Sequence, residues 1–304
     1  MTNGLVEGRD DNYRLEYPAL GRNRMTGLVV TSDCCPPETD AAGLSIVSMV
    51  TVIDGVPYRD SELTAARCLE LVARGSRRVT TSLPPPGEFI EAIRRLNAQD
   101  VLVLTGTRRF SGSYSSACLA ARICAEESEL PVSIRVLDTK SAVAGTGLLV
   151  RLGLRIVADG APVEAVERRV RRAITQVWLA GALHVRDSIH RAQRLPAFAL
   201  KIAASVNRMP AFAMTSKGVS LLGVPRKSDA VRYLTECAAN RLGGRPASIL
   251  IFHADELESA QKLAGCVKSH VNATAIEIAS LSAAVLSQTG PGVIGIAALP
   301  AEGA

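Results

Sequence analysis

Short apolar segments that alternate with helical segments are the feature that most constrains the fold of this 304-residue chain. Residues 28–31, 100–105 and 134–137 are almost entirely apolar, as is typical of strands that are buried on both faces. Helices are expected around and between them at residues 62–74, 88–96 and 113–127. Apolar strands that are separated by helices predict a parallel sheet with helices on both faces.

The second half of the chain continues the alternation. We expect a hairpin at residues 210–222, strands at 247–252, 274–278 and 293–298, and helices at 229–242 and 257–269. The prediction is an α/β protein of two α/β domains: a Rossmann-like parallel sheet in residues 26–175 and a second domain in residues 176–304. Residues 1–25 are polar and aperiodic, which predicts a mobile N-terminal extension. Residues 45–53 are expected to form one strand.

The composition argues against several classes of protein. The net charge of +6 comes mainly from scattered arginines, and aromatic residues make up only 4% of the chain, so we expect no nucleic-acid partner. No signal-sequence core or bilayer-length apolar run is present, which predicts a cytoplasmic protein without a transmembrane segment. Transient membrane contact is compatible with this. The seven cysteines include no C-x-x-C pair, so we expect reduced thiols, no metal and no cofactor.

Three hydroxyl-rich segments stand where apolar strands give way to turns: residues 80–84, 110–117 and 287–292. Ligands of α/β proteins bind beyond the carboxyl ends of the strands, so these segments together predict a site for one small anion. The alternative is that their hydroxyls serve only helix capping and turn chemistry. The candidate ligand-binding residues on these segments are Thr81, Ser82, Ser111, Gly112, Gln288 and Thr289.

The same segments resemble the DegV family of bacterial fatty-acid-binding proteins. The T-S-x-P-x-x-G-E-F segment of the family matches residues 81–89, and its S-G-T-Y-x-S-A segment matches residues 111–117. The T-G-P-G end of its C-terminal H-T-G-P-G loop matches residues 289–292. The matches keep their order over residues 28–299.

The resemblance implies that a long-chain fatty acid is buried in a tunnel at the domain interface, without catalysis. It also implies that Thr81, Ser111 and the position of Gln288 hold the carboxylate, although the family has histidine where this chain has Gln288. A fatty acid kinase is the partner that the family suggests. Here Ser188-Ile189-His190 stands in place of the family's G-G-R segment, so the kinase partnership is less secure than the fold.

Two alternatives remain open. A diverged family member would bind another carboxylated or phosphorylated ligand and act in regulation. A hydrolase or phosphotransferase would use Ser111 as its nucleophile, which needs a neighbouring base. The four histidines lie outside the three segments, and the chain has no phosphate-binding G-x-x-x-x-G-K-[ST] loop.

Overall fold

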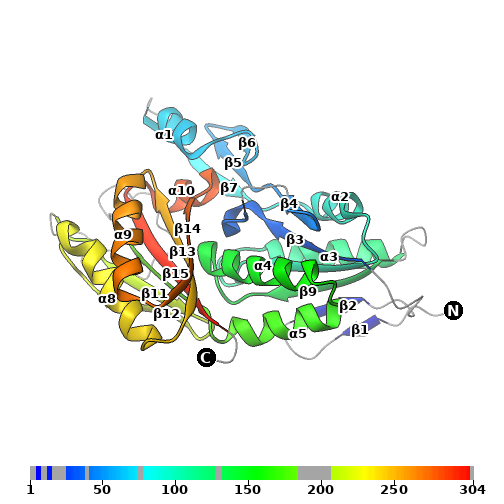
Figure 1. Cartoon of the computed structure of the whole chain (residues 1–304). Coiled ribbons are helices and arrows are strands. Elements are labelled where there is room, and N and C mark those ends of the chain that lie inside the picture. Colours follow the sequence, from blue (N-terminus) through cyan, green and yellow to red (C-terminus); the bar gives the residue numbers. More distant parts are fainter. Residues whose placement is uncertain are drawn as a thin grey trace.

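The computed structural model describes residues 5–7, 12–15, 25–37, 41–73, 78–126, 132–183 and 207–301. Two lobes lie side by side, and each is built on a six-stranded sheet (Figure 1). We call these the N-terminal sheet and the C-terminal sheet. A small three-stranded sheet lies above the junction of the lobes in Figure 1.

The N-terminal sheet has the order β1-β2-β9-β8-β3-β4. Its central strands are parallel: β3 pairs with β4 and β8, and β8 pairs with β9. Its strands are β1 (Leu5–Glu7), β2 (Asn12–Leu15), β3 (Thr26–Thr31), β4 (Leu44–Val47), β8 (Asp100–Thr105) and β9 (Ser133–Asp138). The predicted parallel sheet is therefore confirmed. Within the predicted N-terminal extension, β1 and β2 form a hairpin whose second strand pairs antiparallel with β9.

Helices cover both faces of the N-terminal sheet because successive strand residues point to opposite sides. On β8, Val101 and Val103 share a core with α2 (Pro86–Leu96) and α3 (Ser113–Glu126). Leu102 and Leu104 face the opposite side, toward α4 (Val143–Ala158) and α5 (Val163–Ile174). Burial on both faces is the physical reason that these strands are apolar throughout.

The small sheet corrects one prediction. Residues 45–53 do not form one strand: β4 ends at Val47, and β5 (Val50–Ile53) pairs antiparallel with β6 (Val56–Arg59) and β7 (Val79–Ser82). Ser48 marks the break, where its hydroxyl accepts a hydrogen bond from the backbone N–H of Ser61 at 3.1 Å. The chain then continues into α1 (Ala65–Ala73). As part of this small sheet, β7, which carries Thr81, lies next to the C-terminal lobe.

The C-terminal sheet has the order β12-β11-β10-β15-β13-β14, and its pairs are antiparallel except for β13 with β14. Its strands are β10 (Trp178–Ala182), β11 (Ala211–Thr215), β12 (Gly218–Gly223), β13 (Ala247–Ala254), β14 (Ala273–Ser280) and β15 (Val293–Pro300). The helices of this lobe are α8 (Ala230–Leu242), α9 (Leu257–His270) and the short α10 (Ala283–Thr289). Helices α8 and α9 cover one face of the sheet.

Helix α4 lies between the two lobes and packs on the other face of the C-terminal sheet (Figure 1). One hydrophobic cluster contains Leu102 of β8, Leu148 of α4 and Leu250 of β13. Gly147 lets α4 pack closely on both lobes, because a Cβ atom there would lie 2.8 Å from the carbonyl oxygens of Cys34 and Cys35 in the N-terminal lobe and 3.0 Å from Cδ2 of Leu250 in the C-terminal sheet. The lobes are therefore joined through a shared core.

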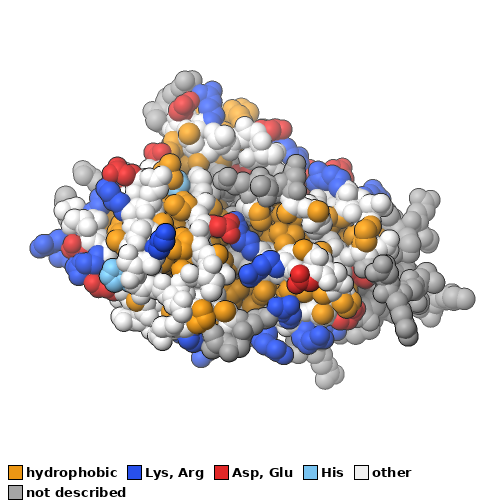
Figure 2. Space-filling view, in the orientation of Figure 1, with side chains coloured by type: hydrophobic (Ala, Val, Ile, Leu, Met, Phe, Trp, Pro, Cys, Tyr) orange, Lys and Arg blue, Asp and Glu red, His pale blue; other side chains and the backbone are white. Residues whose placement is uncertain are grey.

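The composition led to expectations about surface charge, membrane-spanning segments and cysteines. On the face in Figure 2, Lys and Arg side chains are scattered and interrupted by acidic ones. Among the described residues, no helix has both the length and the apolar character needed to cross a bilayer. All seven cysteines are free thiols in the structure.

Candidate functional site

A cavity of about 350 Å³ opens between the two lobes. We call it the interlobe cavity. The N-terminal lobe contributes the loops that follow β3, β8 and β9, together with β7 of the small sheet. The C-terminal lobe contributes β10, β11, β13 and the helix α10. The volume falls in the range of ligand pockets, roughly 300–1,000 Å³.

Two of the three hydroxyl-rich segments meet directly at this cavity. The side-chain Nε2 of Gln288 on α10 donates a hydrogen bond to Oγ1 of Thr81 on β7, at 3.0 Å. These residues are 207 positions apart in the chain, and both line the cavity. The contact leaves a carboxamide and a hydroxyl side by side at the boundary between the lobes.

Ser111 brings the third segment to the cavity. It lies in the loop between β8 and α3, where its Oγ accepts a hydrogen bond from the backbone N–H of Ser113 at 3.2 Å. The hydroxyls of Ser111 and Ser113 are 2.8 Å apart. This hydroxyl pair stands at the start of α3, where the first backbone N–H groups of a helix point outward and favour anions.

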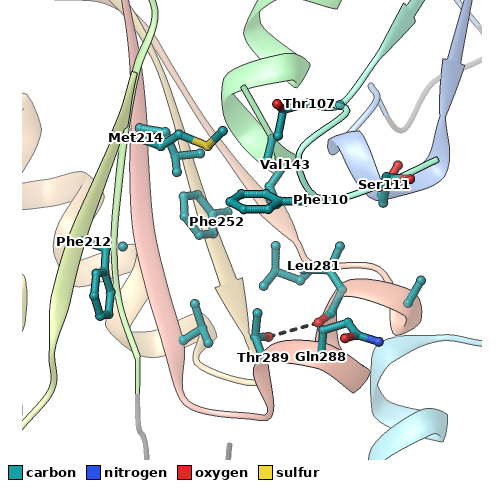
Figure 3. Close-up of a pocket in the computed structure, with 18 of the residues that line it drawn as sticks. Thr107, Phe110, Ser111, Val143, Phe212, Met214, Phe252, Leu281, Gln288 and Thr289 are labelled. Atoms are coloured by element: carbon teal, nitrogen blue, oxygen red, sulfur yellow. Dashed lines mark hydrogen bonds between the residues drawn. The ribbon is translucent and has the colours of Figure 1, made fainter. Parts of the chain in front are cut away.

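The remaining predicted site residues differ in their placement. Thr289 lines the interlobe cavity, and its Oγ1 donates to the carbonyl of Val285 at 3.2 Å (Figure 3). Ser82 is exposed and does not line this cavity. Gly112 lines an adjoining shallow hollow together with Arg108 and Arg109. The structure therefore brings Thr81, Ser111, Gln288 and Thr289 to one cavity.

Most of the cavity wall is apolar, and sequence reasoning did not identify these residues. In Figure 3 Ser111 and Gln288 lie at one side, Met214 and Phe212 lie at the other, and Phe252 lies between them. Phe212 and Met214 alternate on β11 with alanines that face α8. The alternation of large side chains with alanines could have indicated that the two faces of β11 pack differently. Only the tertiary structure shows which face of the strand meets the cavity.

Asp33 is the ionisable residue among the described residues that line the cavity. Burial raises the pKa of its carboxyl above the ordinary value, and hydrogen bonds from Thr31 and Cys34 oppose this shift in part. Desolvation raises the pKa of a carboxyl because it penalises the charged form. Compared with an exposed aspartate, Asp33 therefore takes up a proton more readily, which reduces the negative charge at the cavity.

No histidine is among the described residues that line the cavity, and the described residues contain no cluster suited to hold a metal ion. His253 is buried on β13 and accepts a hydrogen bond from the backbone N–H of Glu256. Burial lowers the pKa of His253. The kinase prediction refers to the Ser188-Ile189-His190 stretch, which lies outside the described residues, as does His184.

One family model matches most of the chain. Residues 25–301 match the family model described as "Uncharacterised protein, DegV family". The chain belongs to the DegV family. The resemblance seen in the three hydroxyl-rich segments is thus confirmed. A DegV domain-containing protein of Streptomyces coelicolor is 27% identical over 261 residues, covering 84% of this chain and 90% of the relative. Another from Deinococcus radiodurans is 25% identical over 278 residues, with coverage of 89% and 96%.

Solved structures of other DegV proteins have the same fold. A fatty-acid-binding DegV protein of Thermus thermophilus is 24% identical, with a TM-score of 0.82 and coverage of 91% of this chain and 100% of its own. A DegV protein of Eubacterium eligens loaded with heptadecanoic acid is 19% identical, with a TM-score of 0.81 and the same coverage. The predicted architecture of two α/β lobes is confirmed by these likenesses.

Proposed function

We propose that this DegV protein binds a long-chain fatty acid in the interlobe cavity. The acyl chain occupies the apolar part, and the carboxylate accepts hydrogen bonds from Thr81, Ser111 and Gln288. The observation that carries the proposal is the junction of an apolar cavity with neutral donors from two lobes. The fatty acids bound by the Thermus thermophilus and Eubacterium eligens DegV proteins support it.

The apolar part of the cavity and its hydrogen-bond donors suit the two ends of a fatty acid. Each buried methylene contributes about 0.8 kcal/mol before other costs, so a long chain supplies most of the affinity. A carboxylate that leaves water must be hydrogen-bonded, and each bond to a charged acceptor contributes about 1.5–3 kcal/mol. The raised pKa of Asp33 lessens repulsion of the bound anion.

Binding fits the polar groups better than catalysis does. A serine nucleophile needs a neighbouring base, whereas the described hydroxyl partner of Ser111 is Ser113. Presentation of the carboxylate to a fatty acid kinase, a cytoplasmic location and membrane contact remain predictions. The alternative, another carboxylated or phosphorylated ligand, is an outcome of the experiment that follows.

The experiment is native and denaturing mass spectrometry of protein purified without added lipid, followed by titration with hexadecanoic acid. We expect one fatty acid per chain. Thr81→Val and Ser111→Ala should each lower the affinity by about tenfold or more, since each removes a hydrogen bond to a charged group. Thr274→Val and Ser269→Ala remove exposed hydroxyls elsewhere and are the matched controls.

A stoichiometric acid of another class would assign the cavity to the alternative ligand. Failure of both the purified protein and the titrated protein to hold a fatty acid would refute the proposed function. Equal affinities for the site variants and their controls would refute the assigned carboxylate contacts.

A further inference from the structure

Two glycines and two phenylalanines form one row across four neighbouring strands of the C-terminal sheet. Phe212 on β11 pairs with Gly181 on β10, and Gly181 pairs with Gly295 on β15. Gly295 in turn pairs with Phe252 on β13. Residues that pair directly across a sheet share one face, so the row reads Phe–Gly–Gly–Phe along that face.

This face of the sheet is the one that meets the interlobe cavity. Phe212, Gly181 and Phe252 line the cavity. The neighbours of the two glycines along their strands, Ala180 and Ile294, belong instead to the core beneath α8 and α9. The glycines therefore remove side chains from the cavity side of the sheet, where two large rings flank them.

The ring of Phe252 lies over the backbone of both glycines. A Cβ atom at Gly295 would be 2.1 Å from Cζ and 2.5 Å from Cε1 of Phe252. A Cβ atom at Gly181 would be 3.3 Å from Cζ and 3.6 Å from Cε2 of the same ring. Glycine inside a strand often marks the close approach of another group, and here the ring takes the space that side chains would occupy.

We propose that the Gly181–Gly295 pair determines acyl-chain length in the interlobe cavity. Because neither glycine carries a side chain, the Phe252 ring packs close to the strands and fills less of the cavity between Ser111 and Met214. Phe110 and Val143 also line this part of the cavity (Figure 3). A side chain at Gly181 would lift the ring into the path of the chain. This inference rests on the proposed fatty-acid binding, and it names residues that limit which fatty acid fits.

The physical signature is the dependence of affinity on chain length. While each added methylene is buried, affinity rises about fourfold per methylene. The rise stops where the chain meets an obstacle, because further methylenes remain in water or force side chains to move. If the Phe252 ring were displaced into the cavity, affinity would stop rising at a shorter chain length.

The test measures affinities for the saturated acids from decanoic to octadecanoic, for the wild type and for Gly181→Ala and Gly181→Val. The alanine Cβ requires the ring to move by only a few tenths of an ångström, and valine adds two methyl groups. We expect the ratio of hexadecanoic to decanoic affinity to fall about threefold in Gly181→Ala and at least tenfold in Gly181→Val. Gly295→Ala is unsuitable, because its Cβ would also lie 2.6 Å from the carbonyl oxygen of Ala180.

Two further variants distinguish an effect of the Phe252 ring from a general loss of folding or binding. Gly265→Ala is the matched control, since a Cβ atom at this exposed helical position meets nothing within 4 Å. It should keep the wild-type chain-length profile. Phe252→Leu combined with Gly181→Val removes the lifted ring and should restore most of the hexadecanoic affinity.

The outcomes distinguish this inference from the proposed function. If the wild type binds fatty acids but folded Gly181→Val keeps the wild-type ratio, the role of the glycine pair is overturned. An equal loss at every chain length, without rescue by Phe252→Leu, also overturns it. A wild type that binds no fatty acid of any length overturns the proposed function, and with it this inference.

Discussion

Gln288 occupies the position where the DegV pattern has a histidine. Its amide donates to Thr81 across the boundary between the lobes, but an amide does not titrate and supplies no positive charge. The sequence therefore predicts that this position adds no pH dependence between about pH 5.5 and about pH 7.5. Asp33 adds a different effect: its raised pKa means that a carboxylate appears in the cavity, and opposes an anion, as the pH rises through that pKa.

Gln288→His should introduce a titration that the wild type lacks. An imidazolium attracts a bound carboxylate, so binding raises the pKa of the new histidine. The gain in affinity is fully present below the pKa of the ligand-free variant and is lost as the pH rises through the pKa of the complex. We expect about a five- to tenfold gain at low pH, with the change near about pH 6.5.

The measurement is the fatty-acid affinity of both proteins across this pH range, expressed as a ratio. Since Asp33 and the ionisation of the free fatty acid are common to both, the ratio isolates position 288. A ratio that does not change with pH would show that residue 288 is remote from the carboxylate.

Helix α10 is held by the N-terminal lobe at both of its ends. At its start, Oδ1 of Asp60 accepts a hydrogen bond from the backbone N–H of Ala284 at 3.0 Å. The other carboxylate oxygen, Oδ2, accepts one from Ser32 at 2.7 Å. At its end, Gln288 reaches Thr81. Asp60 thus fixes the helix that carries Gln288.

Asp60→Ala should weaken both the fold and the site. Loss of a capping carboxylate lowers the free energy of unfolding by about 0.5–2 kcal/mol, and a displaced α10 should lower fatty-acid affinity. Urea unfolding and ligand titration measure the two effects. Asp229→Ala is the control, because Asp229 precedes α8 without a side-chain capping bond. Similar results for both variants would contradict a positioning role for Asp60.

At the level of elements, the sequence predicted the strands and helices more accurately than their pairing. The apolar strands β3, β8 and β9 were recognised because burial on both faces leaves a continuous apolar run. The separation of β4 from β5 was missed because residues on both sides of Ser48 favour strands, and the new pairing is with segments that follow later in the chain. Local propensity does not specify such partners.

At the scale of the whole molecule, the two lobes share a hydrophobic core around α4. The division predicted at residue 175 falls between α5 and β10, but the shared core crosses it. Removing the C-terminal lobe would expose the apolar surface of α4 to water, and removing the N-terminal lobe, which includes α4, would expose the face of the C-terminal sheet that α4 covers. This physical coupling favours unfolding of both lobes together.

Thermal unfolding should therefore give one transition, with equal calorimetric and van't Hoff enthalpies. Differential scanning calorimetry of the full chain measures both quantities. Saturating fatty acid should raise the transition temperature without splitting it, since a ligand at 100 times its Kd stabilises by about 2.7 kcal/mol. Two resolved transitions would indicate that each lobe folds on its own and that the core around α4 couples them weakly.

The sequence by itself determined the α/β class, most of the apolar strands and the three hydroxyl-rich segments, because alternation, burial and turn chemistry are written in neighbouring residues. It also indicated the family through motifs that keep their order. Only the tertiary structure decided that Gln288 meets Thr81, that Asp33 faces a cavity, and that Phe252 lies over Gly181 and Gly295. Such contacts depend on strand register and on the closure of long loops, and a one-residue shift in register would turn each side chain to the opposite face.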